Sequence, residues 1–119
     1  MEDYKLGAME TKFAELMWEN EPIMSGELVK LCEKVLSWKK STTYTMLRRL
    51  CERNLFQNIN GVVSSIINKE EFQALQSEQF IQETFDGSLP RFLTAFVSRK
   101  KLSEKEIEDL QKLINQHRG

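Results

Sequence analysis

Hydrophobic positions in the first part of the chain recur every three or four residues, the spacing of amphipathic helices. Pro22 ends the first such stretch, because the residue before a proline is pushed out of helical geometry. Ser25 is a favourable cap for the second stretch, and the polar residues 37–40 leave room only for a turn before the third. The predicted elements are a helix over Ala8–Asn20, a strand stub at Ile23–Met24, a second helix from the Ser25 cap and a third helix over about 41–53. The second helix has an apolar stripe of Leu28, Leu31, Cys32 and Val35. The third has an apolar face of Met46, Leu47, Leu50 and Cys51.

After Asn54 the hydrophobic period changes from that of a helix to the alternation of β-strands. Two alternating stretches, 55–59 and 62–67, flank Asn60-Gly61. Asn-Gly favours a tight type I′ turn, in which both central residues need positive φ, so these stretches predict a β-hairpin. Helix, strand stub, helix, turn, helix and hairpin follow the order of a winged helix-turn-helix domain, which we assign to residues 1–68.

Residues 69–119 are predicted to form three further helices. Capping-box spacing marks two helix starts, at Asn68 and at Ser103, and Ser88 caps the helix between them. The first of these helices is expected to run to about Phe85. The expected fold is therefore mainly α, with a small β-hairpin wing on a winged helix-turn-helix and a C-terminal helical region.

Five of the seven phenylalanines lie in residues 69–119, and so small a helical piece has too little interior to bury them alone. They can pack back onto the first domain or meet a second copy of the chain. We favour the second copy, because a symmetric reader of DNA needs a dimer, and we assign 69–119 as a helical dimerisation domain. The residues expected at the dimer interface are Phe72, Phe80, Phe85, Phe92, Phe96 and Leu110.

The charge of the chain is unevenly distributed, although its net charge is only −1. Residues 38–53 carry five basic residues against one acid. The second helix of a helix-turn-helix pair enters the major groove with its N-terminus first, so the helix over 41–53 is expected to meet DNA. Its hydroxyls suit base edges and its cations suit phosphates. The candidate DNA-binding residues are Lys39, Lys40, Ser41, Thr42, Thr43, Tyr44, Thr45, Arg48 and Arg49.

A protein-interaction module without DNA binding is the alternative, since hydroxyl residues favour helix starts and basic residues often coat a solvated face. The wing tip, residues 57–65, contains no Lys or Arg and supports this alternative. An enzyme is disfavoured, because the sequence has no Gly-rich phosphate loop and no nucleophile–base pair. We expect no catalytic residues, no metal site and no cofactor.

The remaining chemistry of the sequence is ordinary for a cytoplasmic protein. Cys32 and Cys51 belong to no CxxC motif or Cys/His cluster and are expected to be packing residues. His117 has no acidic or nucleophilic partner around it. No apolar run approaches the roughly 18 residues that span a bilayer, and no signal-peptide pattern is visible at the start, so no membrane contact is expected.

The run from Trp38 to Leu50 resembles the recognition helix of the penicillinase-repressor family (BlaI/MecI type). That helix typically has the pattern W-x-x-x-T-x-x-T-x-L-x-R-L, which is matched here by Trp38, Thr42, Thr45, Leu47, Arg49 and Leu50. The upstream helix around residues 10–18, the Asn-Leu-Phe at 54–56 and the tail at 92–110 are also similar, so the resemblance covers nearly the whole chain.

The resemblance implies a homodimeric repressor that binds an inverted repeat containing TACA and TGTA in double-stranded DNA. In the β-lactam-responsive branch a membrane sensor-protease leads to cleavage of the repressor, and the matching bond here joins Ala95 and Phe96. The copper-responsive branch has a C-terminal cysteine cluster, which is absent after Cys51. The wing departs from the family, whose members often carry basic and aromatic residues there.

Overall fold

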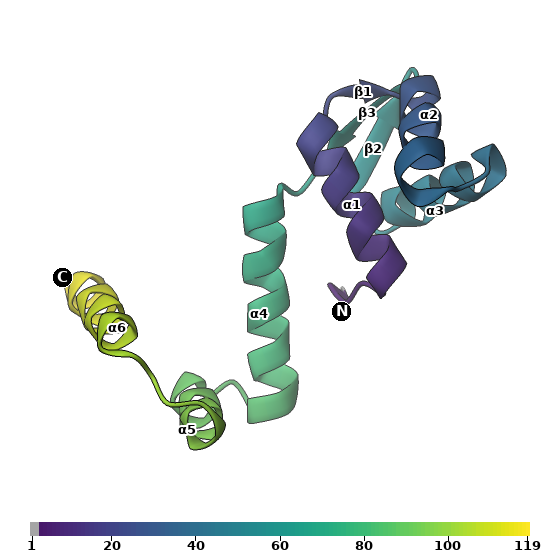
Figure 1. Ribbon diagram of the computed structural model, residues 1–119. Coiled ribbons are helices and arrows are strands. Elements are labelled where there is room, and N and C mark those ends of the chain that lie inside the picture. The colour runs from purple at the N-terminus through teal and green to yellow at the C-terminus, as the bar shows by residue number, and fades with distance from the viewer. Residues whose placement is uncertain (1–2) are drawn as a thin grey trace. The chain divides into compact units, whose positions relative to one another are not determined.

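The structure, a computed structural model, describes residues 3–119 and is mainly helical with one small sheet, which confirms the expected fold class (Figure 1). The first helix and the strand stub occupy the predicted residues. In chain order the elements are α1 (Ala8–Asn20), β1 (Ile23–Met24), α2 (Ser25–Leu36), α3 (Lys40–Glu52), β2 (Phe56–Ile59), β3 (Val62–Ser65), α4 (Lys69–Phe85), α5 (Leu89–Arg99) and α6 (Glu104–Arg118).

The chain divides into two compact units, one ending at Gln79 and the other beginning at Phe80. The division falls inside α4 rather than at the expected boundary between residues 68 and 69. The reason is Phe72, which is only 2% exposed and packs in the core of the first unit, so that the first half of α4 belongs there. No helix within residues 3–119 is long and apolar enough to cross a membrane.

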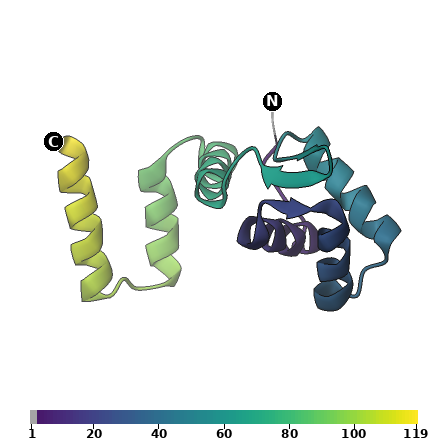
Figure 2. The same cartoon turned by 90° about the horizontal axis from the view of Figure 1, so that it is seen from above.

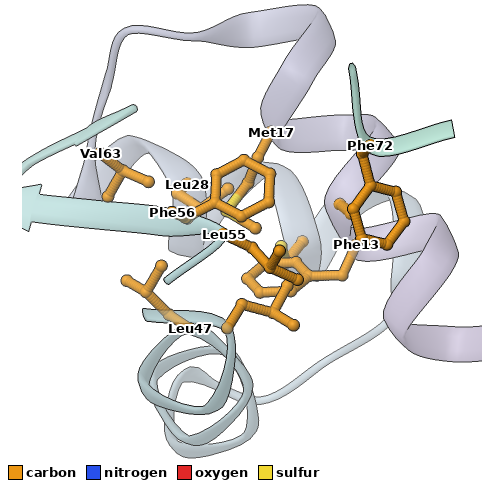
Figure 3. Close-up of a cluster of buried hydrophobic side chains, with 11 residues drawn as sticks. Phe13, Met17, Leu28, Leu47, Leu55, Phe56, Val63 and Phe72 are labelled. Atoms are coloured by element: carbon orange, nitrogen blue, oxygen red, sulfur yellow. The ribbon is translucent and has the colours of Figure 1, made fainter. Parts of the chain in front are cut away.

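A single hydrophobic core holds the first unit together, and it draws side chains from α1, α2, α3, the hairpin and α4 (Figure 3). Tyr4, Trp18 and Trp38 pack around its edge, and the Trp18 indole N–H donates a hydrogen bond to the Ile67 carbonyl at 3.1 Å. The buried members are Phe13, Ala14, Met17, Leu28, Cys32, Leu47, Leu50, Leu55, Phe56, Val63 and Phe72.

The hairpin and the strand stub form an antiparallel sheet of order β1-β3-β2. Val63 sits in its centre, opposite Ile23 on one side and Asn58 on the other, and is fully buried. Asn60 and Gly61 both have positive φ, 52° and 86°, as the Asn-Gly turn predicts. The alternation of the strands thus places one face of the sheet on the core and leaves the other in solvent.

Two local expectations about α2 were wrong. Ser25 is the first residue of the helix, whereas Met24 occupies the cap position and no side chain caps the helix. The Ser25 backbone N–H donates to the Gly61 carbonyl of the wing turn at 2.8 Å. Val35 is 53% exposed, whereas Leu36 packs against the core. Leu36 lies four residues after buried Cys32, and the chain then turns at Ser37 in the left-handed conformation.

In the second unit no residue of α5 or α6 is buried. Figure 2 shows these two helices joined by a short connection, at residues 100–103. Both helices begin at the expected caps, since the hydroxyls of Ser88 and Ser103 accept hydrogen bonds from the backbone N–H groups three residues later. The N-terminal ends of α5 and α6 are therefore well defined, although these helices bury no residue.

Candidate nucleic-acid interface

The helix α3 has one buried side and one exposed side. Its buried residues, Thr43, Leu47 and Leu50, follow the spacing i, i+4, i+7, and the two leucines belong to the core of the first unit. The exposed residues follow a second stripe of the same spacing on the opposite side of the helix. We call this stripe the reading face, and its members are Ser41, Thr42, Thr45, Arg48 and Arg49.

Two lysines extend the reading face at the N-terminus of α3. Lys39 occupies the cap position without a side-chain cap, and Lys40 is the first helical residue. Both are exposed and line a surface hollow of about 510 Å³ in the turn between α2 and α3. The first N–H groups of a helix have no partner within it and carry partial positive charge, so this end of α3 attracts anions. Trp38 anchors the turn by packing on Phe13, with ring centroids 5.2 Å apart.

The wing lies beside α3. Asn58 of β2 and Arg48 line one hollow of about 330 Å³, whose floor includes Leu47 and Cys51. Asn58 was not among the predicted site residues. The alternation of β2 contains the signal, because Asn58 is two positions after buried Phe56 and therefore lies on the same face of the sheet.

Thr43 was wrongly placed among the DNA-binding candidates. Its side chain is 1% exposed, so it cannot reach a ligand in solvent. Its hydroxyl lies beside the thiol of Cys32, a weak hydrogen-bonding group, and has no stronger partner. Thr43 shares the buried stripe of α3 because it precedes Leu47 by four residues.

Tyr44 is half-buried and belongs partly to the structure of the unit. Its ring packs against the core, and its hydroxyl donates to the Ser25 hydroxyl at the start of α2, at 3.4 Å. It also lines the hollow that contains Arg48. The phenol thus reaches the surface beside the reading face without lying on it.

Arg53 turns away from the reading face, although it contributes to the basic segment in the sequence. Its Nη2 donates to the backbone carbonyls of Asp3 and Lys5, and its Nη1 lies 3.6 Å from a carboxylate oxygen of Glu10. The cations left to the interface are Lys39, Lys40, Arg48 and Arg49, all of them exposed.

The two cysteines are packing residues. Both are free thiols, and burial raises the pKa of each. The nearby Thr43 hydroxyl partly offsets this rise of the pKa at Cys32, whereas the charge of Glu52 adds to it at Cys51. At neutral pH both thiols therefore stay protonated, the unreactive form. Residues 3–119 contain no group of three His, Cys, Asp or Glu residues placed to hold a metal ion.

The aromatic residues predicted for a dimer interface fall into two groups. Phe72 is wrongly placed in that set, since it is buried in the first unit against Tyr4 and Trp18. The other four phenylalanines contact one another in the second unit, and Leu110 lines a groove of about 340 Å³ with Phe92 and Phe96. Phe80 is 49% exposed and Phe96 41% exposed, so the cluster remains largely open to solvent.

The proposed cleavage site is also exposed. Ala95 and Phe96 lie in the middle of α5, and Phe96 borders the groove.

Comparison with known proteins gives one consistent result. The sequence pattern of a family described as "Penicillinase repressor" matches residues 6–116. The penicillinase repressor of Bacillus licheniformis is 23% identical over 114 residues, which cover 92% of this chain and 89% of that protein. The methicillin resistance regulatory protein MecI of Staphylococcus aureus (strain Mu50 / ATCC 700699) is 21% identical over 116 residues, 94% of each chain. The MecI protein of Mammaliicoccus sciuri is 20% identical over the same share. The similarity therefore spans both compact units.

Replacing Thr43 by Val is expected to stabilise the first unit by about 1 kcal/mol, because it removes a buried hydroxyl that lacks a strong partner. Urea unfolding followed by circular dichroism measures the change. Thr42→Val, on the exposed side of the same helix, is the matched control and should leave the free energy of unfolding within about 0.5 kcal/mol. A loss of stability in the Thr43 variant would mean that its hydroxyl donates a bond the core needs.

Proposed function

The chain belongs to the penicillinase repressor family, and we propose that it is a homodimeric transcriptional repressor whose α3 helices bind an inverted-repeat operator in double-stranded DNA. Members of this family are repressors rather than enzymes. The observation that carries the proposal is the reading face of α3, where hydroxyl groups near the helix start are followed by Arg48 and Arg49 on the same side.

Electrostatics supports DNA as the partner of this face. Duplex DNA carries one negative charge per about 1.7 Å of its axis, and cations that contact phosphates release counterions on binding. Lys39 and Lys40 at the start of α3 add to the partial positive charge of the helix N-terminus, and Arg48 and Arg49 lie two turns further along. Phosphate contacts at both ends of the helix would fix its register along the major groove.

The hydroxyl residues supply the specificity. Ser41, Thr42 and Thr45 lie on the side of α3 that faces away from the core, in its first turns. A Thr hydroxyl can bond a base edge while its methyl group contacts the methyl group of thymine. The TACA and TGTA half-sites that the family resemblance implies present both adenine edges and thymine methyls, so these side chains suit that operator.

The second unit supplies the dimer contact. Phe80, Phe92 and Phe96 form an aromatic cluster that is open to solvent, and Ile107, Leu113 and Ile114 are exposed along α6. An apolar surface of this kind is costly in water and is typical of an interface. A second copy of the chain would cover the same surface on both protomers by two-fold symmetry, and the inverted repeat requires that symmetry.

A protein-interaction module that does not bind DNA is the second candidate, and one observation favours it. Met24, Val62 and Ile59 are direct neighbours across the sheet, and all three are exposed on its outer side. This short apolar row offers a contact for a protein, whereas the reading face offers none that is apolar. A gel shift with a TACA/TGTA repeat at modest salt separates the two, because only the repressor retards the duplex.

Cleavage between Ala95 and Phe96 by a sensor-protease is the route by which we propose repression is relieved. A protease binds its substrate in an extended form, so α5 must unwind locally before it is cut. No residue of α5 is buried within the protomer, and local opening of such a helix costs little free energy. The cut would separate Phe96 and α6 from the rest of the aromatic cluster and so weaken the dimer.

The affinity for DNA should fall steeply with salt. If four cations from each protomer contact phosphates, a plot of log K against log salt should have a slope of about −7, and Arg49→Ala should flatten it by about 2 units per dimer. Fluorescence anisotropy across a salt series measures both slopes. Lys112→Ala removes the same charge from the polar side of α6 and should leave the slope unchanged. A slope near zero for the unmodified protein would contradict phosphate binding by this face.

Thr45→Ala should weaken binding to the preferred operator by about 1–3 kcal/mol per half-site, the usual size of a base contact, with nonspecific binding nearly unchanged. Competition between the operator and a scrambled duplex measures the two effects separately. Thr84→Ala, an exposed threonine on α4, is the matched control and should alter neither. Equal losses on both duplexes would show that Thr45 contacts the DNA backbone.

Phe96→Asp should convert the protein from a dimer to a monomer at micromolar concentration, because a buried carboxylate without a partner opposes association. Sedimentation equilibrium measures the mass directly. Thr94→Asp places the same charge on the opposite side of α5 and should leave the dimer intact. An unmodified protein that sediments as a monomer with α5 and α6 folded would rule out the proposed interface.

A further inference from the structure

The segment between the N-terminus and α1, residues 3–7, makes contacts with two separate elements of the first unit. On one side it meets Arg53, the residue that caps the C-terminal end of α3. On the other side it meets α4, the helix whose later residues belong to the second unit. We call this segment the strap.

Tyr4 ties the strap to α4 through its backbone and its ring. Its backbone N–H donates to Gln79 Oε1 at 2.8 Å, and its carbonyl accepts from Gln76 Nε2 at 3.0 Å. Its ring packs edge-on against Phe72, with centroids 6.1 Å apart. Phe72, Gln76 and Gln79 are spaced i, i+4, i+7, so they form one stripe along two turns of α4.

Arg53, at the end of α3, and Glu10, in the first turn of α1, hold the strap on the side away from α4. Arg53 Nη2 donates to the carbonyl of Asp3 and to that of Lys5, the latter at 2.8 Å. Glu10 accepts the Gly7 N–H at 3.1 Å and also pairs with Arg53 at 3.6 Å. The backbone on both sides of Tyr4 is thus held at the end of α3 and the start of α1.

These contacts matter for α4 because Phe72, in its first turn, is the one buried residue among the described residues of the helix. One buried side chain near an end leaves a helix free to pivot about that point. Gln79 lies about 10 Å further along the axis than Phe72, at 1.5 Å per residue. A contact at that distance restricts the rotation of α4 about Phe72 far more effectively than a contact beside Phe72.

We propose that the strap fixes the direction in which α4 leaves the winged-helix unit, and that Gln76 and Gln79 thereby set the half-site spacing that the repressor accepts. This inference rests on the proposed function, a dimer joined through the second unit. In such a dimer the chain runs from each α3 to the dimer contact through the hairpin and then α4. The angle of α4 then determines how far apart the two reading faces lie, which must match a whole turn of duplex, about 34 Å, or a multiple of it.

The test is a double variant, Gln76→Ala with Gln79→Ala, in the full-length protein. It removes both hydrogen bonds to Tyr4 and leaves the reading face, Arg53 and the aromatic cluster unchanged. The matched control is Gln73→Ala with Gln82→Ala, which makes the same substitutions at two exposed positions of the same helix that lie off the stripe formed by Phe72, Gln76 and Gln79. Thermal unfolding of each variant establishes that the first unit remains folded.

Binding is measured on an inverted repeat that the unmodified protein selects from random duplexes, on versions with one or two base pairs added or removed between the half-sites, and on a single half-site. The unmodified protein and the control should bind duplexes of altered spacing about tenfold or more weakly than the original repeat. The double variant at Gln76 and Gln79, the strap variant, should lose only about twofold. The reason is that two ordinary hydrogen bonds together change an equilibrium constant roughly tenfold. Half-site affinity and sedimentation should be the same for all three. A strap variant that keeps the original spacing preference overturns the inference.

A second measurement is independent of DNA. Residual dipolar couplings of the backbone N–H groups at 73–79, compared with those of α1, report the orientation of α4 within the first unit. The strap variant should show reduced, averaged couplings in α4, and the control should not. Unchanged couplings in the strap variant overturn the inference. If the unmodified protein binds no duplex but the strap variant shows averaged couplings, the proposed function is refuted and the role of the strap in orienting α4 stands.

Discussion

The rotation of α3 about its own axis is the constraint on which the proposed interface depends. The first unit has one hydrophobic core, to which α3 contributes Leu47 and Leu50, and Thr43 is buried on the same side of the helix. Burying a leucine side chain is worth about 2 kcal/mol, more than an exposed ion pair contributes, so the core decides which side of the helix turns inward. Thr45 and Arg48 then lie on the opposite side as a geometric consequence. The polar surface of α3 is therefore specified by its apolar residues.

Elements defined by neighbouring residues could be predicted from the sequence, and contacts between distant residues could not. The Asn60-Gly61 turn and the Ser103 cap depend on residues a few positions apart, and the structure has both where the pattern indicates them. Phe72 was misjudged because its ring partners, Tyr4 and Trp18, are distant in the sequence. The hydrogen bonds of Arg53 to the strap likewise join residues 48 and 50 positions apart. The burial of Thr43 is different, because its spacing from the two leucines of α3 was visible, but a hydroxyl at a helix start suits a DNA contact equally well.

The second unit gains less stability from the burial of apolar side chains than the first does. Its helices have good caps, but no residue of α5 or α6 is buried, so the apolar surface removed from water is small compared with the conformational entropy lost on ordering. Association with another copy would supply the missing burial and would make the stability of this unit depend on protein concentration. Dimerisation, folding of α5 and operator binding would then be linked, and cutting the chain in α5 would affect all three together.

The uncharged wing increases the importance of that linkage. Residues 57–65 contain no Lys or Arg, so in the proposed complex the cations of the interface come from α3 and the turn before it. A winged-helix unit held on DNA by one helix alone can rotate about the axis of that helix, because phosphate contacts along a single line do not resist such rotation. A basic wing would resist it by contacting the backbone at a second place. In the proposed dimer the resistance would come from the other protomer through α4, and a helix that pivots freely could not transmit it. A rigid attachment of α4 to the winged-helix unit would therefore replace the resistance to rotation that an uncharged wing does not supply.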